Sequence, residues 1–261
     1  MTFFAGVDIG SLCTKVVILD SARNIIAHAI LRSGAAYKGA AESALSEALN
    51  SAGLSFNQLG YIVSTGYGRA RVPFANREIT EISCHARGAG FYFPAVRTVI
   101  DIGGQDSKVI RVNEKGQAVR FVMNDKCAAG TGRFLEVMAG ALDEDLDEMS
   151  ELSFQARENI EVSSMCTVFA ESEVISLFAK GYPKQEIAGA VYRSIARRVV
   201  GLVGQLGLSE KVAMTGGVAK SRGMLRAIEE KLGTTLQVPV EPQIVGALGA
   251  ALFASEKAGV G

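Results

Sequence analysis

Residues Val7–Val17 read VDIGSLCTKVV, and residues Ile100–Ile110 read IDIGGQDSKVI. The two segments carry Asp, Ile, Gly, Lys and Val at matching positions, and Val/Ile and Thr/Ser exchanges fill neighbouring places. Each describes an apolar strand that ends at an acidic residue, a glycine turn, and a second β-branched strand. Because a repeated sequence indicates a repeated supersecondary unit, the chain is predicted to contain two related halves.

Strands and helical stretches alternate along the rest of the chain. Helices are expected at residues 37–52, 78–90, 133–142, 167–180, 184–206, 221–232 and 245–258, and further strands at 61–64 and 212–215. This alternation predicts an α/β fold with mixed sheets. We place the first half at residues 1–95 and the second at residues 96–261, with the C-terminal helix able to pack back on the first half.

The bulk properties exclude several classes of protein. The chain has 261 residues, 48% of them hydrophobic, which is enough to bury a sizeable core. Its formal net charge is zero and it has no long basic run, so a nucleic-acid partner is not expected. No apolar stretch reaches the roughly 18 residues of a membrane span, and no basic, apolar leader opens the chain. We therefore expect a cytoplasmic protein without a membrane partner.

Both predicted hairpins carry groups suited to a nucleoside triphosphate. Glycine turns let backbone N–H groups approach an anion closely, and hydroxyl and ammonium groups are donors for phosphate oxygens. Asp8 and Asp101 are assigned to Mg²⁺ positioning and water orientation, because Mg²⁺ takes few carboxylates and several waters. The residues assigned to ATP or ADP are Gly10, Ser11, Leu12, Cys13, Thr14 and Lys15, then Gly103, Gly104, Gln105 and Asp106, then Gly216, Gly217 and Val218 in a third glycine turn, and Gln243.

Any one Asp-x-Gly turn more often just closes a hairpin. Two matching copies, together with a strand–Gly–Gly–helix turn at residues 212–219, favour a nucleotide site. The chain contains no G-x-x-x-x-G-K-[ST] loop, so a P-loop protein is excluded. A dinucleotide-binding fold is disfavoured because no G-x-G-x-x-G opens a helix after the first strand.

Cys127 and Cys166 each lie just before a predicted helix. Helix N-termini lower the pKa of a thiol and favour negative charge, which suits thiolate ligands. A [4Fe–4S] cluster takes about four thiolates, so two per chain would need a second copy related by a two-fold axis. From the residues alone, redox sensing and plain burial stay open for this pair. Cys84 and His85 have no metal-ligand spacing and are assigned to the core or the surface.

The three glycine turns resemble those of the superfamily of acetate and sugar kinases, heat-shock chaperones and actin. This resemblance implies two duplicated ribonuclease-H-like (actin-like) halves with ATP in the cleft between them.

A closer resemblance lies in the cysteine segments Asn124–Phe134 and Ser163–Ser176, and in Thr65–Arg69 and Ile82–Ala86. With the two hairpins, they resemble the ATP-dependent activators (archerases, component A) of 2-hydroxyacyl-CoA dehydratases and benzoyl-CoA reductases. The resemblance implies a homodimer with one bridging [4Fe–4S] cluster, held here by Cys127 and Cys166. One departure is Leu12-Cys13, where the family usually has small residues, so Cys13 is either near the phosphates or a structural thiol.

The expected function is ATP-driven, low-potential one-electron transfer to an iron–sulfur dehydratase, reductase or double-cubane cluster protein. Ferredoxin or flavodoxin is the expected electron donor, and anaerobic metabolism is implied. A small-molecule sugar or acyl kinase of the same superfamily is the alternative, and it predicts a colourless protein with buried thiols. A nucleotide-dependent binding module is a third reading, with ATPase activity that does not depend on either cysteine.

Overall fold

The computed structural model describes residues 2–34, 36–163, 166–209 and 211–259. The chain forms two compact units. Unit 1 contains residues 1–99, 110–119 and 239–261, and unit 2 contains residues 100–109 and 120–238. The boundary expected after residue 95 stays a prediction.

The first sheet has five strands in the order β3-β2-β1-β4-β5. The strands are β1 (Phe3–Ile9), β2 (Cys13–Leu19), β3 (Ile25–Arg32), β4 (Leu59–Thr65) and β5 (Arg77–Glu78). The hairpin of β1 and β2 is antiparallel, with Asp8 opposite Lys15, and β4 runs parallel to β1 with Thr65 beside Asp8. The end of β1 is therefore flanked by Lys15 of β2 on one side and by Thr65, the last residue of β4, on the other.

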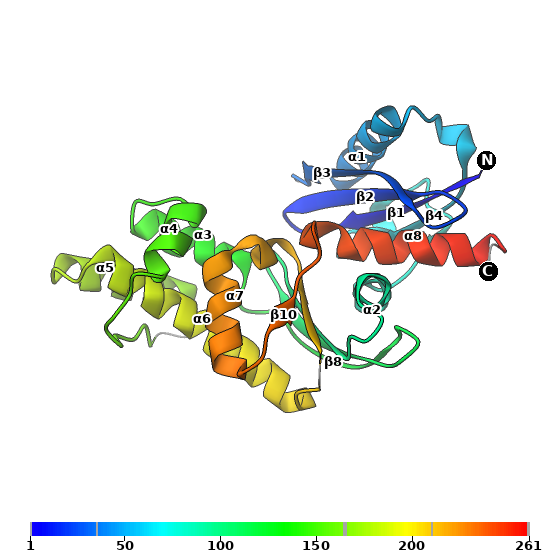
Figure 1. The fold of residues 1–261 in the computed structure, drawn as a ribbon. Coiled ribbons are helices and arrows are strands. Elements are labelled where there is room, and N and C mark those ends of the chain that lie inside the picture. Colours follow the sequence, from blue (N-terminus) through cyan, green and yellow to red (C-terminus); the bar gives the residue numbers. More distant parts are fainter. Residues whose placement is uncertain (1, 35, 164–165, 210, 260–261) are drawn as a thin grey trace. The chain divides into compact units, whose positions relative to one another are not determined.

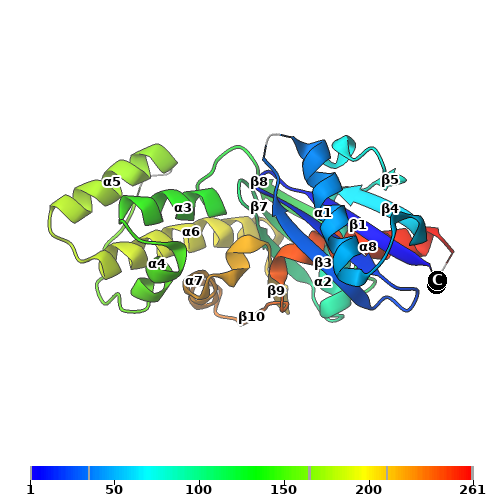
Figure 2. The ribbon, with the colours of Figure 1, turned by 90° about the horizontal axis from the view of Figure 1, so that it is seen from above.

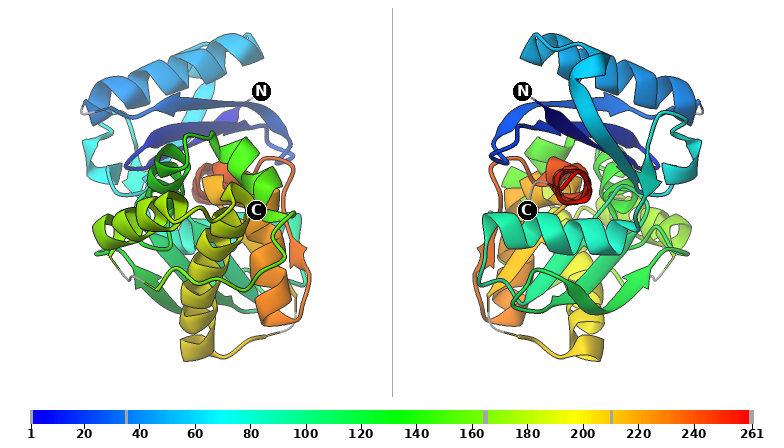
Figure 3. Two further views of the ribbon diagram at one scale, coloured as in Figure 1. Left: turned by 90° about the vertical axis from the view of Figure 1, so that its left-hand side faces the viewer. Right: turned by 90° about the vertical axis from the view of Figure 1, so that its right-hand side faces the viewer.

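Helices cover both faces of this sheet, as Figures 1 and 3 show. Alternate residues of β1 separate the faces, because side chains of a strand point to opposite sides. Val7 and Ile9 pack with α1 (Tyr37–Ala52), while Phe4 packs with α8 (Val245–Lys257). Asp8 shares the parity of Phe4, so its side chain lies on the α8 face.

Glycines bring α8 close to its neighbours. A Cβ atom on Gly6 of β1 would lie 1.9 Å from the carbonyl oxygen of Ala247. A Cβ atom on Gly249 of α8 would lie 1.8 Å from the carbonyl oxygen of Cys84 in α2 (Glu81–Tyr92). Any side chain at these positions would push the elements apart. The C-terminal helix is thus packed on the sheet of unit 1.

The second sheet has the order β10-β9-β6-β7-β8. Its strands are β6 (Thr98–Ile102), β7 (Ser107–Val112), β8 (Ala118–Asn124), β9 (Val212–Thr215) and β10 (Leu236–Gln237). Read from the other edge, this order matches that of the first sheet strand for strand. The predicted duplication into two ribonuclease-H-like α/β halves is confirmed.

Among the described residues of unit 2 there are five α-helices, which Figure 2 shows side by side. They are α3 (Gly132–Ala141), α4 (Leu146–Ser153), α5 (Thr167–Ala179), α6 (Lys184–Leu206) and α7 (Arg222–Leu232). The core of the unit joins Ile100, Ile102 and Val109 of the sheet to fully buried Phe134 and Tyr192 of the helices. Within the described ranges, no helix has the length and apolar character needed to cross a membrane.

Most predicted elements are present, and five helices and strands are additional. The helices predicted at 37–52 and 184–206 match α1 and α6. The additional elements are β3, β5, β8, α4 and β10, and Glu78, which was predicted to begin a helix, lies in β5. Strand β8 lies at a sheet edge with exposed residues at its centre, which weakens the apolar pattern. Helix α4 carried a usable signal, because Asp145 and Glu148 form a capping box at its start.

Short 3₁₀ turns complete the chain. They are η1 (Phe56–Gln58), η2 (Arg69–Arg71), η3 (Gly217–Lys220) and η4 (Pro242–Ile244).

Candidate functional site

The first hairpin closes through a hydrogen bond from the backbone N–H of Gly10 to the carbonyl of Cys13, at 3.0 Å. The Nζ atom of Lys15 lies 3.1 Å from Oδ2 of Asp8, which is 4% exposed. Gly10, Ser11, Leu12 and Cys13 form the half-exposed turn. The turn therefore offers its backbone to a ligand, and the Asp8–Lys15 ion pair lies behind it.

Thr14 does not belong to the open part of this turn. Its side chain is fully buried, and its Oγ1 lies 3.0 Å from the hydroxyl of Ser33. The Ser33 hydroxyl in turn donates to the carbonyl of Gly10 at 2.8 Å. Thr14 thus supports the turn from inside, and Ser33 is a supporting residue that the sequence analysis did not include.

Two further residues converge on Asp8. A Cβ atom on Gly246 of α8 would lie 2.9 Å from Nε2 of His85 and 3.1 Å from Oδ2 of Asp8. His85 is buried in α2, so it belongs to the surroundings of the carboxylate. His85 was assigned to the core or the surface for lack of metal-ligand spacing, and its place beside Asp8 was not predicted, since residues 8, 85 and 246 are far apart in the chain.

The second hairpin repeats the arrangement of the first. The Nζ atom of Lys108 lies 3.1 Å from Oδ2 of Asp101 and 2.9 Å from Oδ2 of Asp106. The Thr215 hydroxyl donates to Oδ1 of Asp101 at 2.8 Å. Asp101 and Lys108 are almost completely buried, whereas Asp106 is partly exposed. Both oxygens of Asp101 therefore have protein partners, and Asp106 is the more accessible carboxylate.

The turn of the second hairpin contains Gly103, Gly104 and exposed Gln105. Gly103 donates its N–H to the carbonyl of Asp106 at 2.9 Å. The carbonyls of Gly103 and Gly104 accept hydrogen bonds from the N–H groups of Gly132 and Arg133, at 2.9 and 2.8 Å. These two donors begin α3. The hairpin is therefore tied by its main chain to the helix that follows the Cys127 segment.

The third glycine turn lies beside Asp101. Gly216 follows β9 with φ of 86°, and η3 begins at exposed Gly217 with buried Val218 behind it. Gly66 occupies the equivalent place in unit 1, with φ of 88° after β4 and Asp8 close by. The sequence analysis did not assign Gly66, although Thr65-Gly66 and Thr215-Gly216 are the same dipeptide at the end of equivalent strands.

Replacing Gly216 by alanine is expected to destabilise the protein by about 2–4 kcal/mol. The added Cβ would lie 2.3 Å from the carbonyl oxygen of Ile102 and 3.0 Å from Oδ1 of Asp101, at a backbone angle that disfavours side chains. Urea unfolding gives the free energy of unfolding directly.

Gly233→Ala is the matched control for Gly216→Ala. Gly233 also has a positive φ, of 67°, but no atom lies within 4 Å of its added Cβ. Gly233→Ala should therefore lower the free energy of unfolding by only about 1–2 kcal/mol, through backbone strain. Equal losses in the two variants would mean that the close approach at Gly216 contributes nothing.

Gln243 lies in η4, in unit 1, and is half-buried. Its backbone N–H donates to Oε1 of Glu241 at 3.0 Å. Its assignment to the nucleotide stays a prediction.

The Cys127 segment is a loop between β8 and α3. The Asn124 side chain donates to the carbonyls of Cys127 and Ala129, at 2.8 and 3.1 Å. Cys127 is half-buried against the core of unit 2. It precedes the first residue of α3, Gly132, by five positions, so it lies in the loop before the helix and not at its N-cap.

Cys166 is the N-cap residue of α5 and is exposed. Its side chain makes no capping hydrogen bond. Ser164 and Met165, in the same predicted segment, lie outside the described residues. Four large apolar side chains of α5 are also exposed, namely Val168, Phe169, Ile175 and Phe178.

Cys127 and Cys166 fit a soft metal group better than Cys84 does. Cys84 is fully buried in α2, and burial raises the pKa of its thiol to about 12. Cys127 is half-buried and Cys166 is exposed. In the part of the chain that the structure describes, no three His, Cys, Asp or Glu side chains gather as metal ligands. One chain therefore offers at most a part of a thiolate ligand set.

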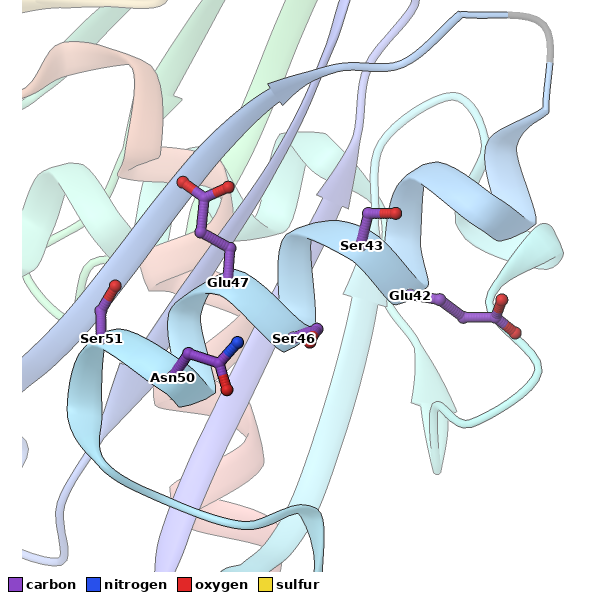
Figure 4. Close-up of a pocket in the computed structure, with 6 residues that line it drawn as sticks. All are labelled: Glu42, Ser43, Ser46, Glu47, Asn50 and Ser51. Carbon is purple, nitrogen blue, oxygen red and sulfur yellow. The ribbon is translucent and has the colours of Figure 1, made fainter.

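A shallow hollow on the outer side of α1 contains neither hairpin (Figure 4). It is lined by Glu42, Ser43, Ser46, Glu47, Asn50 and Ser51. All six come from one helix and point outward in Figure 4, as expected for the solvated side of an amphipathic helix.

Comparisons with known proteins agree with these features. The profile of the BadF/BadG/BcrA/BcrD ATPase family matches residues 5–254. The activator of lactoyl-CoA dehydratase from Anaerotignum propionicum is 49% identical over 253 residues, which is 97% of each chain.

Two solved structures match almost the whole chain. Component A of (R)-2-hydroxyglutaryl-CoA dehydratase from Acidaminococcus fermentans has a TM-score of 0.95 and 43% identity, covering 99% of this chain and 100% of that one. The activator of the 2-hydroxyisocaproyl-CoA dehydratase from Clostridium difficile, with bound ADPNP, has a TM-score of 0.93 and 42% identity, covering 99% and 96%.

Proposed function

Because the chain belongs to the BadF/BadG/BcrA/BcrD ATPase family, we propose that it is an ATP-dependent activator of an iron–sulfur dehydratase. It would use ATP binding and hydrolysis to drive the transfer of one electron to that partner. A 2-hydroxyacyl-CoA dehydratase or a double-cubane cluster protein is the proposed acceptor, and ferredoxin or flavodoxin the donor. The activators named among its relatives support this assignment.

ATP with Mg²⁺ is proposed to bind through the backbone of the glycine turns. The turns at residues 10–13, 103–105 and 216–217 would donate N–H groups to the phosphates. Asp8 and Asp101 would hold Mg²⁺ through water, since both carboxylates are buried and paired with lysines. The ADPNP bound in a solved relative supports a nucleotide here.

Cys127 and Cys166 are the proposed ligands of a [4Fe–4S] cluster. Such a cluster supplies one-electron chemistry at potentials from about −700 to +450 mV, tuned by exposure and hydrogen bonding. Two thiols per chain leave the ligand set incomplete, so a second copy must supply the other two. The exposed apolar residues of α5, next to Cys166, suit burial against this second copy.

Two main-chain hydrogen bonds between the second hairpin and α3 support the proposed coupling of nucleotide binding to the cluster. Gly103 and Gly104 accept them from Gly132 and Arg133, at 2.9 and 2.8 Å. A ligand that moves the hairpin must move the start of α3, and with it the loop that carries Cys127. Shifting a two-state equilibrium from 1:99 to 99:1 needs about 5.5 kcal/mol of differential binding, which contacts to a triphosphate can supply.

The test is anaerobic purification, followed by iron and sulfide content and the EPR spectrum of the reduced protein with and without ATP. About four irons per dimer are expected. The spectrum should change with ATP, because ATP alters the surroundings of the thiols. An iron-free, colourless protein after careful anaerobic reconstitution would contradict the proposal and favour the small-molecule kinase.

A further inference from the structure

The segment of residues 157–163, which leads toward Cys166, has no helix or strand of its own. Backbone N–H and C=O groups in such a segment need partners from elsewhere in the protein. Many of these partners are charged side chains of α5 and α6. The segment is thus held by ionised groups, and not by a sheet ladder.

Glu186 holds the start of the segment. Its carboxylate is buried, at 5% exposure, and accepts three hydrogen bonds from backbone N–H groups. Two come from Arg157 at 3.0 Å and one from Glu158 at 2.7 Å. Gly189, one turn further along α6, allows this approach, because its added Cβ would lie 2.5 Å from the Cβ of Ala156.

Two arginines of α6 bind the middle and the end of the 157–163 segment. Arg193 donates to the carbonyls of Glu158 and Ile160, at 3.3 and 3.0 Å. Arg197 donates to the carbonyl of Val162 at 3.1 Å and to the Glu161 carboxylate at 2.7 Å. Residues 186, 193 and 197 are seven and four positions apart, so they share one face of α6.

Glu173 fastens the end of the segment to α5. Its two carboxylate oxygens each accept from the N–H of Ser163 at 3.1 Å, and one also accepts from the Ser163 hydroxyl at 3.0 Å. Cys166 is the N-cap of this same helix. Three residues span at most about 11 Å, so fixing Ser163 on α5 limits where the chain can enter the helix.

We propose that Glu173, Glu186, Arg193 and Arg197, here called the clamp, are positioning residues for Cys166. This inference rests on the proposed role of Cys166 as a cluster ligand. The clamp would hold an exposed thiol in one place before and after metal binding, which lowers the cost of ordering it. Outer partners that orient a ligand also tune the group that it binds.

The first test uses iron-free protein, so it does not depend on the proposed function. A nitroxide spin label is attached to Cys166 in a Cys13→Ser, Cys127→Ser background, where buried Cys84 stays unlabelled. Glu186→Gln and the more exposed Arg197→Gln should each give a more mobile label. In Glu186→Gln, the amides of residues 157 and 158, which donate to the Glu186 carboxylate, should exchange about tenfold faster with solvent, as expected when a charged hydrogen bond is lost.

Arg222→Gln is the matched control. Arg222 also forms an ion pair in unit 2, with Glu151 at 3.2 Å, and its guanidinium lies over the ring of Phe154, so both of these partners lie outside the 157–163 segment. Arg222→Gln should leave both the mobility of the label on Cys166 and the exchange rates of the amides in the 157–163 segment unchanged. Unchanged label mobility in both clamp variants would overturn the proposal.

The second test uses the reconstituted protein with Cys13, Cys127 and Cys166 intact. Glu186→Gln and Arg197→Gln should shift the midpoint potential and broaden the EPR spectrum relative to Arg222→Gln, and Arg197→Lys should restore part of the change. An unaltered potential and spectrum would reduce the clamp to a structural role and overturn the proposal. A wild-type protein without iron would instead refute the proposed function, while the label experiment would still decide whether the clamp positions Cys166.

Discussion

Replacing Cys166 by serine is expected to abolish stable iron binding after anaerobic reconstitution. In the proposed symmetric dimer each substitution would remove two ligands at once, so about half of the proposed four-thiolate set would be lost. Cys127→Ser should have the same effect for the same reason. Iron and sulfide analysis, with the visible spectrum, measures the loss.

Cys13→Ser is the control for these variants. Cys13 is a free thiol of intermediate exposure in the first hairpin, in unit 1, so it should keep the full iron content. Retention of iron by both Cys127→Ser and Cys166→Ser would exclude them as the ligands. Loss of iron from Cys13→Ser as well would mean that the substitutions act through folding.

Replacing Lys108 by methionine is expected to destabilise the protein by about 3–5 kcal/mol. The Lys108 side chain is 3% exposed and contacts both Asp101 and Asp106, so its removal leaves a buried carboxylate without its cation. The Thr215 hydroxyl, which donates to the same carboxylate, carries no charge that could replace that of Lys108. Urea unfolding at neutral pH measures the effect.

Two further variants separate the buried ion pair from a general loss of charge. Arg226→Met removes an exposed pair with Glu230 in the same unit and should cost only about 0–1 kcal/mol. Adding Asp101→Asn to Lys108→Met should recover part of the stability, because the uncompensated charge is gone. If Lys108→Met and Arg226→Met have the same free energy of unfolding, the ion pair with Lys108 does not stabilise the buried Asp101 carboxylate.

The repeat of the two hairpins could be predicted because it is local. An aspartate, a glycine turn and a lysine seven positions after the aspartate recur in Val7–Val17 and Ile100–Ile110. The same alignment matches Lys108 to Lys15, but the ion pairs of these lysines with Asp101 and Asp8 were not predicted, because Lys15 was assigned to the nucleotide and Lys108 to no site. Most helices were predictable for the same reason, because their apolar period lies within one stretch of chain.

The surroundings of the two aspartates could not be predicted. Thr215 is 114 positions from Asp101, and His85 and Gly246 reach Asp8 from two other helices. No period in the chain encodes which residues of two distant elements will face each other. The place of Cys127 also differs from expectation, since a loop held by Asn124 separates it from α3.

The sequence by itself determined the duplicated α/β fold, the paired glycine turns and the two cysteine segments, because each is a pattern within a few consecutive residues. Only the tertiary structure decided that Gly132 and Arg133 bind the second hairpin, and that α5 and α6 hold the segment before Cys166. These contacts join backbone groups to residues far along the chain. Backbone groups are the same in every residue, so their pairing depends on how the elements pack and not on a sequence motif.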